Sequence, residues 1–255
     1  MNDIRKDLWT DLRRLTAARI GLQRSGASLA TAPLLAFQLA HARARDAVYR
    51  RLDVNQLKND LAALGLPVLT VESAAADRQL YLMRPDLGRR LAPQADATLA
   101  PHAGHYDLAC IVCDGLSAQA VQLHAASVLT KLLPLLRGFR IAPLVIVWHG
   151  RVAAGDAVAV ALNADSVVTL IGERPGLSSP DSMGAYLTWN PGPNTTDADR
   201  NCISNIRSGG IGYADAALKI AHLLRAMRAR GVSGVLLKDD SDALLPGGAP
   251  EKSDR

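Results

Sequence analysis

Hydrophobic residues at helical spacing mark the first quarter of the chain. The first stripe, separated by charged residues, is formed by Leu8, Leu12 and Leu15. This spacing predicts an amphipathic helix. Two further helices are predicted, one over 33–49 and one over 53–65, the second capped by Asp53 with Gln56 three residues later. We therefore expect residues 1–65 to form a helical N-terminal segment.

From about residue 105 the pattern changes to continuous hydrophobic runs that alternate with helical spacing. We predict strands at 107–113, 141–148, 166–171 and 232–237, and helices at 117–136, 156–164 and 213–230. Hydrophobic strands alternating with helices indicate a mostly parallel sheet that is covered on both faces. The expected fold class is α/β, with a Rossmann-like domain over 66–238 that follows the helical segment. The charged tail 239–255, with its Pro-Gly-Gly run, is expected to be disordered.

The stretch 172–212 has no clear periodicity, and we predict a long irregular segment there. Long loops without secondary structure are usually functional or disordered. This one contains Leu177, Tyr186, Trp189 and Ile203, which a disordered segment would rarely hold. We therefore expect an ordered loop that contacts a ligand or another subunit.

Positive charge is concentrated at the N-terminal end. The whole chain carries +5, whereas residues 1–51 hold ten basic and four acidic residues, a net charge of +6. A nucleic-acid-binding protein is one interpretation, and steep salt dependence of binding would identify it. The other is a solvated or subunit-facing helical surface. The interleaved aspartates and the 4% aromatic content favour this second interpretation, with no nucleic acid partner.

The cysteine count and the hydrophobic runs restrict the compartment. Three cysteines cannot form a disulfide framework, which indicates a reducing environment. The first residues lack the hydrophobic core of a signal peptide, and no hydrophobic run approaches the roughly 20 residues of a membrane span. We predict a cytoplasmic protein with no membrane partner.

Several short motifs suggest chemistry, and each also has a structural explanation. Cys110 and Cys113 form a C-x-x-C pair within a predicted strand, where their side chains point to opposite faces, so we interpret them as buried cysteines. His102 and His105 have no carboxylate or cysteine at ligand spacing, and we predict no metal site. The turn 177–180 leaves open a hydrolase with Ser178 or Ser179 as nucleophile, which esterase activity of the chain would reveal.

Six segments carry a resemblance to a known family. They are Leu15-Thr-Ala-Ala-Arg-Ile-Gly-Leu, His41-Ala-Arg-Ala-Arg-Asp-Ala-Val, Tyr81-Leu-Met-Arg-Pro-Asp-Leu-Gly-Arg-Arg-Leu, Asp114-Gly-Leu-Ser-Ala, Ile171-Gly-Glu-Arg-Pro-Gly-Leu-Ser-Ser-Pro-Asp-Ser-Met-Gly-Ala-Tyr-Leu-Thr and Asp197-Ala-Asp-Arg-Asn-Cys-Ile-Ser-Asn-Ile-Arg. In type and order they resemble the small (light) subunit of ethanolamine ammonia-lyase, over roughly residues 8–238. The length of the last two segments makes coincidence implausible.

The resemblance implies a carbon–nitrogen lyase that converts ethanolamine to acetaldehyde and ammonia with adenosylcobalamin. Homolysis of the cobalt–carbon bond gives a 5′-deoxyadenosyl radical that takes a hydrogen from the substrate. In the family this chemistry belongs to the large subunit, so the resemblance implies no catalytic residue in this chain. It also implies a hetero-oligomer with six copies of each subunit, either in a bacterial microcompartment or free in the cytosol.

Carried over to matching positions, the cobalamin contacts fall on Val152, Glu173 and Cys202. A carboxylate can accept hydrogen bonds from the corrin amides, and Arg174 or Arg207 could meet the cofactor phosphate. Taken without the resemblance, Glu173 would suit a salt bridge to an arginine, and Cys202 a buried thiol. The chain lacks D-x-H-x-x-G, so the resemblance implies base-on cobalamin, which keeps its own benzimidazole as the lower ligand.

Overall fold

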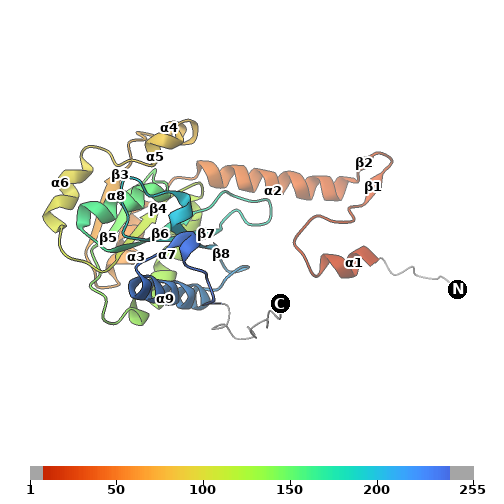
Figure 1. Ribbon diagram of the computed structural model, residues 1–255. Helices are drawn as coiled ribbons and strands as arrows, with labels where there is room; N and C mark the ends of the chain where they lie inside the picture. Colours follow the sequence, from red (N-terminus) through yellow and green to blue (C-terminus); the bar gives the residue numbers. More distant parts are fainter. Residues whose placement is uncertain (1–7, 242–255) are drawn as a thin grey trace.

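A single mixed sheet forms the centre of the computed structural model, which describes residues 8–241 (Figure 1). Its strands, in the order β3-β5-β4-β6-β7-β8, are β3 (Val68–Glu72), β5 (Leu144–Trp148), β4 (Ala109–Cys113), β6 (Ser166–Gly172), β7 (Met183–Trp189) and β8 (Arg200–Ile206). The first four are parallel to one another, and β7 and β8 add an antiparallel hairpin at one edge. The predicted α/β class with a mostly parallel sheet is confirmed, and the closer likeness to a Rossmann-type fold stays a prediction.

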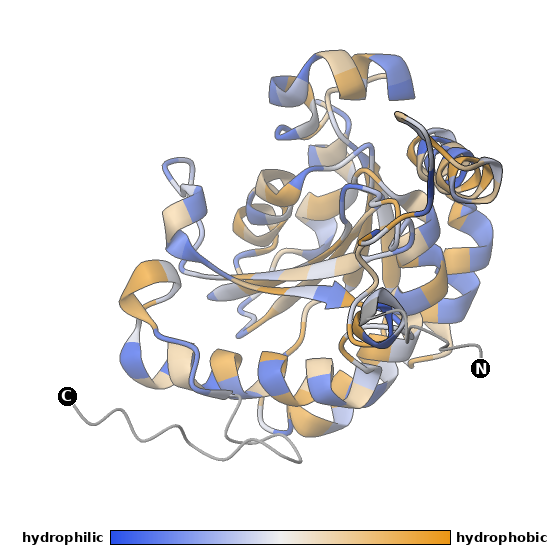
Figure 2. Ribbon diagram, turned by 90° about the vertical axis from the view of Figure 1, so that its right-hand side faces the viewer, coloured by the Kyte–Doolittle hydropathy of each residue, from blue (hydrophilic) through white to orange (hydrophobic). Residues whose placement is uncertain are grey.

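Helices cover both faces of the sheet, which explains why the central strands are hydrophobic throughout. The first face is covered by α3 (Val54–Ala62), α7 (Ala118–Leu132) and α9 (Tyr213–Arg230), and the second by α6 (Ala95–Leu99) and α8 (Val152–Leu162). The helix α9 is amphipathic, and its hydrophobic and hydrophilic residues alternate along the lower edge of Figure 2.

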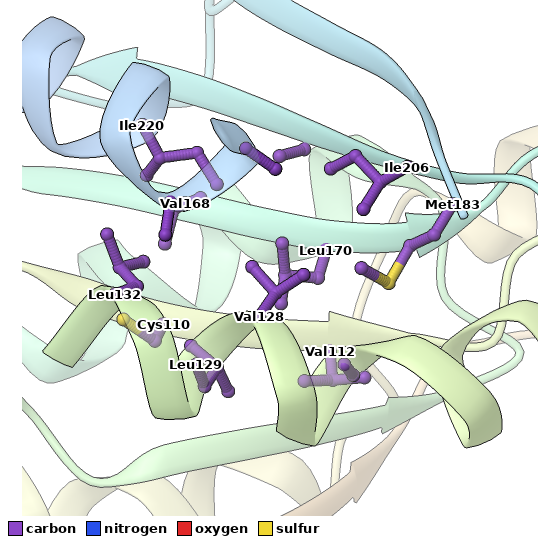
Figure 3. Close-up of a cluster of buried hydrophobic side chains, with 14 of the residues drawn as sticks. Cys110, Val112, Val128, Leu129, Leu132, Val168, Leu170, Met183, Ile206 and Ile220 are labelled. Carbon is purple, nitrogen blue, oxygen red and sulfur yellow. The ribbon is translucent and has the colours of Figure 1, made fainter. Parts of the chain in front are cut away.

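The larger core lies between β4, β6, β7 and the helices α7 and α9 (Figure 3). Val168 and Leu170 from β6 face Val128 and Leu132 from α7, and Ile220 from α9 completes this layer. All five are at most 1% exposed. Truncating one such leucine to alanine typically costs about 2–5 kcal/mol, because the cavity left behind collapses only in part.

The two cysteines of the C-x-x-C pair confirm the strand interpretation. Cys110 belongs to the cluster under α7 and α9, whereas Cys113 belongs to the cluster under α8, so they lie on opposite faces of β4. Both are buried free thiols. Burial raises the pKa of the Cys110 thiol to about 12, which keeps it protonated.

The N-terminal region projects away from the sheet in Figure 1. It consists of α1 (Leu8–Arg13), the short hairpin of β1 (Arg24–Ser25) and β2 (Ser28–Leu29), and α2 (Thr31–Tyr49). The two predicted helices over 33–49 and 53–65 are confirmed as α2 and α3. The stripe that begins at Leu8 is only partly right, because α1 ends at Arg13 and Leu15 is 83% exposed. After Arg13 the chain turns back, and Nε of Arg13 donates to the Ile20 carbonyl oxygen at 3.2 Å.

Two sequence predictions on the C-terminal side are wrong. The stretch 172–212, predicted to be irregular, contains β7 and β8. The residues 232–237, predicted to be a strand, contain instead the 3-10 helix η4 (Gly234–Leu236), which begins at a glycine with φ of 66°. A positive φ interrupts an extended strand and is readily adopted by glycine.

The remaining elements are short. They are α4 (Arg78–Met83), α5 (Pro85–Gly88) and the 3-10 helices η1 (Ala100–His102), η2 (Leu133–Leu135) and η3 (Asp197–Asp199). Of the predicted disordered tail, 242–255 lies outside the described residues. In the part of the chain that the structure describes, we find no helix with the length and hydrophobicity needed to cross a membrane.

Candidate functional site

The carboxyl ends of the parallel strands form the edge where a ligand is expected. In open α/β sheets, ligands bind outside the carboxyl ends of strands where consecutive connections leave towards opposite faces. Here the chain leaves β4 for α7 on one face, and leaves the adjacent β5 for α8 on the other. The turns at this edge carry Asp114, Arg151 and Glu173.

A surface pocket of about 380 Å³ lies at this edge. It is lined by Tyr81, Leu116, Arg151, Val152, Ile171, Gly172, Glu173, Arg174 and Tyr186. The pocket thus joins Val152 and Glu173, two of the three residues that the resemblance indicates. The third, Cys202, is the cross-strand partner of Tyr186 and so lies beside the lining.

Val152 is the first residue of α8, four residues earlier than the predicted helix start at 156. The capping position is Arg151, whose side chain makes no cap hydrogen bond. The first N–H groups of a helix have no partner within the helix, and together with the helix dipole they favour an anion or a carbonyl oxygen. The half-buried Val152 thus places a hydrophobic side chain and a donor-rich helix end on one wall of the pocket.

Glu173 follows β6 directly, and its carboxylate is held by neighbours on the β7–β8 side. Oε2 accepts hydrogen bonds from the Ser182 hydroxyl at 2.5 Å and from the Asn205 backbone N–H at 3.3 Å. Gly184 opposite leaves room for this carboxylate, since a Cβ there would lie 2.9 Å from Oε1. The alternative of a salt bridge to an arginine is not what the described residues show. The half-buried carboxylate is oriented by neutral donors and can accept further hydrogen bonds.

Cys202 and Tyr186 face each other across β8 and β7. Cys202 is exposed, so the alternative of a buried core thiol is wrong. Desolvation by the surrounding residues raises the pKa of both side chains, and the hydrogen bond between them opposes this for the thiol. Both groups therefore keep their protons near neutral pH, and the pair offers a neutral contact surface rather than a reactive thiolate.

Two side chains at this edge were not found from the sequence, Tyr81 and Arg151. The Tyr81 ring lies between the guanidinium groups of Arg78 and Arg151, with ring-centroid distances of 4.8 and 4.5 Å. Arg151 also donates from Nη2 to the Tyr81 carbonyl oxygen at 3.1 Å, while its buried Nε has no partner among the described residues. This unpaired donor beside the pocket fits a polar ligand that accepts a hydrogen bond.

The two arginines proposed for the cofactor phosphate lie in different places. Arg174 is exposed and lines the pocket. Arg207 donates from Nε to the Asn205 side-chain oxygen at 2.7 Å and is not part of the pocket lining. The geometry favours Arg174 over Arg207 for an anion bound in this pocket.

Asp114, in the turn after β4, makes the stability of the fold depend on pH. It is 2% exposed, and its Oδ1 accepts from the Gly150 N–H at 3.1 Å. Burial raises the pKa of its carboxyl to about 7, although Arg78 and backbone N–H groups act in the opposite direction. In the unfolded chain the pKa of an aspartate is about 3.9. Between these values the folded chain binds more protons, so the free energy of unfolding decreases as pH rises from about 4 to 7.

We expect Asp114→Asn to remove this decrease. Urea unfolding at several pH values should show the wild-type free energy falling by roughly 2–4 kcal/mol more than that of the variant across this window. Asp165→Asn, at an exposed position, serves as the control and should keep the wild-type slope. Parallel pH profiles for wild type and Asp114→Asn would contradict the prediction.

Comparison with known proteins identifies the family of the chain. A sequence profile for the ethanolamine ammonia-lyase light chain (EutC) matches residues 6–238. The ethanolamine ammonia-lyase small subunit of Xanthomonas campestris pv. campestris is 52% identical, covering 95% of this chain and 91% of its own length. The small subunits of Azotobacter vinelandii and Bradyrhizobium diazoefficiens are 52% and 54% identical, covering 94% and 92% of this chain and 92% of each relative. With this identity along nearly its whole length, the chain belongs to the ethanolamine ammonia-lyase light chain family.

Proposed function

We propose that this chain is the small subunit of an adenosylcobalamin-dependent ethanolamine ammonia-lyase, which converts ethanolamine to acetaldehyde and ammonia together with a large catalytic subunit. Its part is to form one wall of the cobalamin site at the subunit interface. The observation that carries the proposal is the meeting of Val152, Glu173 and the Tyr186–Cys202 pair at one edge of the sheet. The six-plus-six assembly and a place in the cytoplasm, free or in a microcompartment, belong to the same proposal.

The residues present fit this cofactor as part of a larger site. Cobalamin carries amide side chains and one phosphodiester, which need acceptors, donors and one cationic group. The pocket offers the Glu173 carboxylate, the N-terminal end of α8 with the unpaired Arg151 Nε, and the exposed Arg174. A volume of about 380 Å³ suits only a portion of so large a ligand, since pockets of 300–1,000 Å³ hold drug-sized molecules. The remainder of the site would come from the large subunit.

Each residue has a binding role in this proposal, and none is assigned acid–base catalysis. Glu173 would accept hydrogen bonds from corrin amides, with its carboxylate orientation fixed by Ser182 and Asn205. Val152 and Cys202 would pack against the ring, and their neutral character suits a large apolar macrocycle. When bound base-on, the cofactor itself supplies the radical through homolysis of its cobalt–carbon bond. The protein residues here would hold it and exclude water.

Cofactor titration of the two-subunit complex tests the proposal. For Glu173→Ala we expect the Kd for cyanocobalamin to rise about tenfold to a hundredfold, since a hydrogen bond to a charged group contributes about 1.5–3 kcal/mol. Glu173→Gln keeps the size of the side chain and should lie between this variant and wild type. Glu72→Ala, at the exposed end of β3, is the matched control and should bind as wild type does. If neither Glu173 variant changes the Kd, the proposed cofactor wall is refuted.

A further inference from the structure

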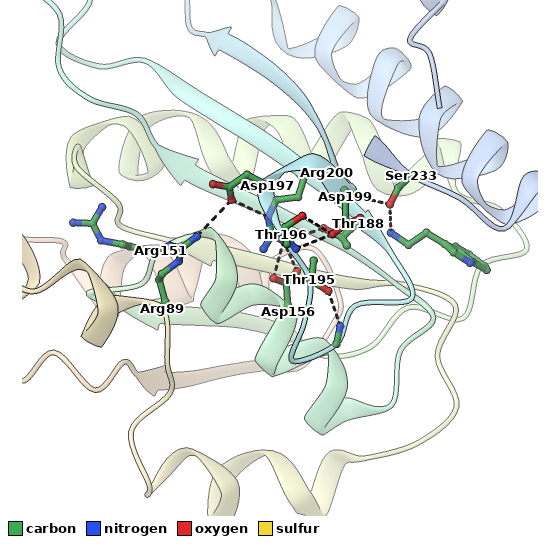
Figure 4. Close-up of polar contacts among 12 residues, drawn as sticks. Arg89, Arg151, Asp156, Thr188, Thr195, Thr196, Asp197, Asp199, Arg200 and Ser233 are labelled. Carbon is green, nitrogen blue, oxygen red and sulfur yellow. Dashed lines mark hydrogen bonds and ion pairs between the residues drawn. The ribbon is translucent and has the colours of Figure 1, made fainter. Parts of the chain in front are cut away.

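A buried ion pair connects α8 to β8, on the face of the sheet that α8 covers (Figure 4). Nη1 of Arg200 lies 2.7 Å from Oδ1 and 2.6 Å from Oδ2 of Asp156, and it also reaches the Thr188 hydroxyl at 3.2 Å. The two charged side chains are only 2% and 7% exposed. Asp197 adds an outer contact at 3.4 Å to Nε.

The pair lies farther from the carboxyl edge of the sheet than two of the proposed cofactor contacts, Val152 and Cys202. Asp156 follows Val152 by four residues on α8, which is about 6 Å along a helix axis. Arg200 precedes Cys202 by two residues on β8, so their side chains share a face and lie about 7 Å apart along the strand. β8 runs towards the carboxyl edge while α8 runs away from it. The ion pair therefore joins the helix and the strand next to Val152 and Cys202, on the side away from the carboxyl edge.

The ion pair is a direct side-chain link between these two elements. α8 packs closely on β6 at Gly155. A Cβ at this position would lie 2.0 Å from the Thr169 hydroxyl oxygen. β8, in contrast, is the edge strand of the described sheet and pairs with β7. Adjacent strands twist relative to one another, so a contact that crosses from β8 to α8 restricts the position of the hairpin relative to the helix.

Stability alone is a poor explanation for this pair. Nη2 of Arg200 is buried without a partner among the described residues, which carries a desolvation penalty. Burial also raises the pKa of the Asp156 carboxyl, and the neighbouring Arg200 only partly opposes this. Well-packed hydrophobic residues are often as stabilising as a buried ion pair, or more so, whereas an ion pair fixes one geometry.

We propose that Asp156 and Arg200 are a positioning pair that holds Val152 and Cys202 at the separation required by the bound cobalamin. The inference rests on the proposed function and extends it to residues that do not touch the cofactor. Its physical basis is that a misplacement of about 1 Å at a binding group can lower activity about a hundredfold. The pair acts through the spacing of the two elements rather than through its own charge.

The experiment replaces the pair without leaving a buried charge. In the two-subunit complex, the double variant Asp156→Leu/Arg200→Met should fold with a melting temperature within a few degrees of wild type. Its KM for adenosylcobalamin should rise about tenfold or more, while the KM for ethanolamine stays unchanged. Arg200→Lys keeps a partner for Asp156 and should retain part of the cofactor affinity that the double variant loses.

Asn201→Ala is the matched control. Asn201 is buried on the same strand, but it bonds the Gly234 and Leu237 backbone on the other side. This variant should lose stability and keep the wild-type KM for adenosylcobalamin. An unchanged KM in the double variant, or an equal rise in Asn201→Ala, would overturn the positioning role.

Two further measurements separate this inference from the proposed function. If Glu173→Ala and Cys202→Ala raise the KM for adenosylcobalamin but the double variant does not, only the positioning role fails. If none of these variants changes it, the proposed cofactor wall fails and the positioning role falls with it.

Hydrogen exchange of the isolated chain gives an independent readout. The double variant should exchange faster at the β8 amides and at the first turn of α8, and unchanged exchange would count against a tie between them.

Discussion

Purified alone, the chain should not deaminate ethanolamine, and mixing it with the large subunit and adenosylcobalamin should restore turnover. The tyrosine and cysteine side chains at the pocket are suited to binding rather than to proton transfer near neutral pH. Desolvation raises the pKa of Tyr81, Tyr186 and Cys202, so each keeps its proton near neutral pH. Within the described residues no cluster of histidine, cysteine or carboxylate side chains could hold a metal ion.

Acetaldehyde formation, coupled to NADH oxidation by alcohol dehydrogenase, measures this expectation. We expect the complete mixture to exceed the isolated chain by at least about a thousandfold, because enzymes accelerate reactions by a million-fold or more. The large subunit with cofactor but without this chain should also be inactive or nearly so, since one wall of the cofactor site would be missing. Cofactor-dependent deamination by the isolated chain would overturn the proposed division of roles.

The sheet could be predicted where both of its faces are covered. Strands β4, β5 and β6 are continuous hydrophobic runs because helices pack on both sides, and this signal is strong even in one sequence. The β7–β8 hairpin was missed because β8 is an edge strand that carries the polar residues Asn201, Ser204 and Asn205. The alternation of Met183, Ala185 and Leu187 in β7 was the available signal, since these side chains enter the core.

The site could be predicted only in part, and chiefly through the family resemblance. Glu173 and Cys202 lie in long segments that carry the family resemblance, whereas Val152 lies in none of these segments. Arg151 and Tyr81 meet across 70 residues of sequence, and nothing in either local segment indicates that contact. The position of the Asp156–Arg200 pair depends on how α8 is placed over an edge strand, which periodicity alone cannot indicate.

The turn beneath Glu173 depends on two glycines that lie against each other. The carbonyl oxygen of Gly172 accepts from the Leu116 N–H at 2.9 Å, so the turn after β4 is tied to the end of β6. A Cβ at Gly172 would lie 2.0 Å from the Ser117 carbonyl oxygen and 2.6 Å from that of Asp114. A Cβ at Gly115, whose φ is 57°, would lie 2.2 Å from the Gly172 carbonyl oxygen. Because these neighbours are backbone atoms, no side-chain rotation can relieve the overlap.

Among the described glycines without a positive φ, we therefore expect Gly172 to be the position where alanine is most destabilising. The clash must displace the turn and with it Ser117, which caps α7 by accepting from the Ala120 N–H. The expected loss is about 4 kcal/mol or more, a large part of the roughly 5–15 kcal/mol that stabilises a typical domain. Thermal unfolding should show a decrease in Tm of about 8–16 °C for a chain of this size.

Two other glycines provide a graded control for Gly172→Ala. A Cβ at Gly192 would have no atom within 4 Å, so Gly192→Ala should change stability by no more than about 0.5 kcal/mol. Gly138 is equally open but has a φ of 87°, and Gly138→Ala should cost about 1 kcal/mol through backbone strain. If Gly172→Ala unfolds at the same temperature as Gly192→Ala, the close approach of the two turns is wrong. The placement of Glu173 beside the pocket would then be wrong too, because that contact fixes the end of β6 from which Glu173 extends.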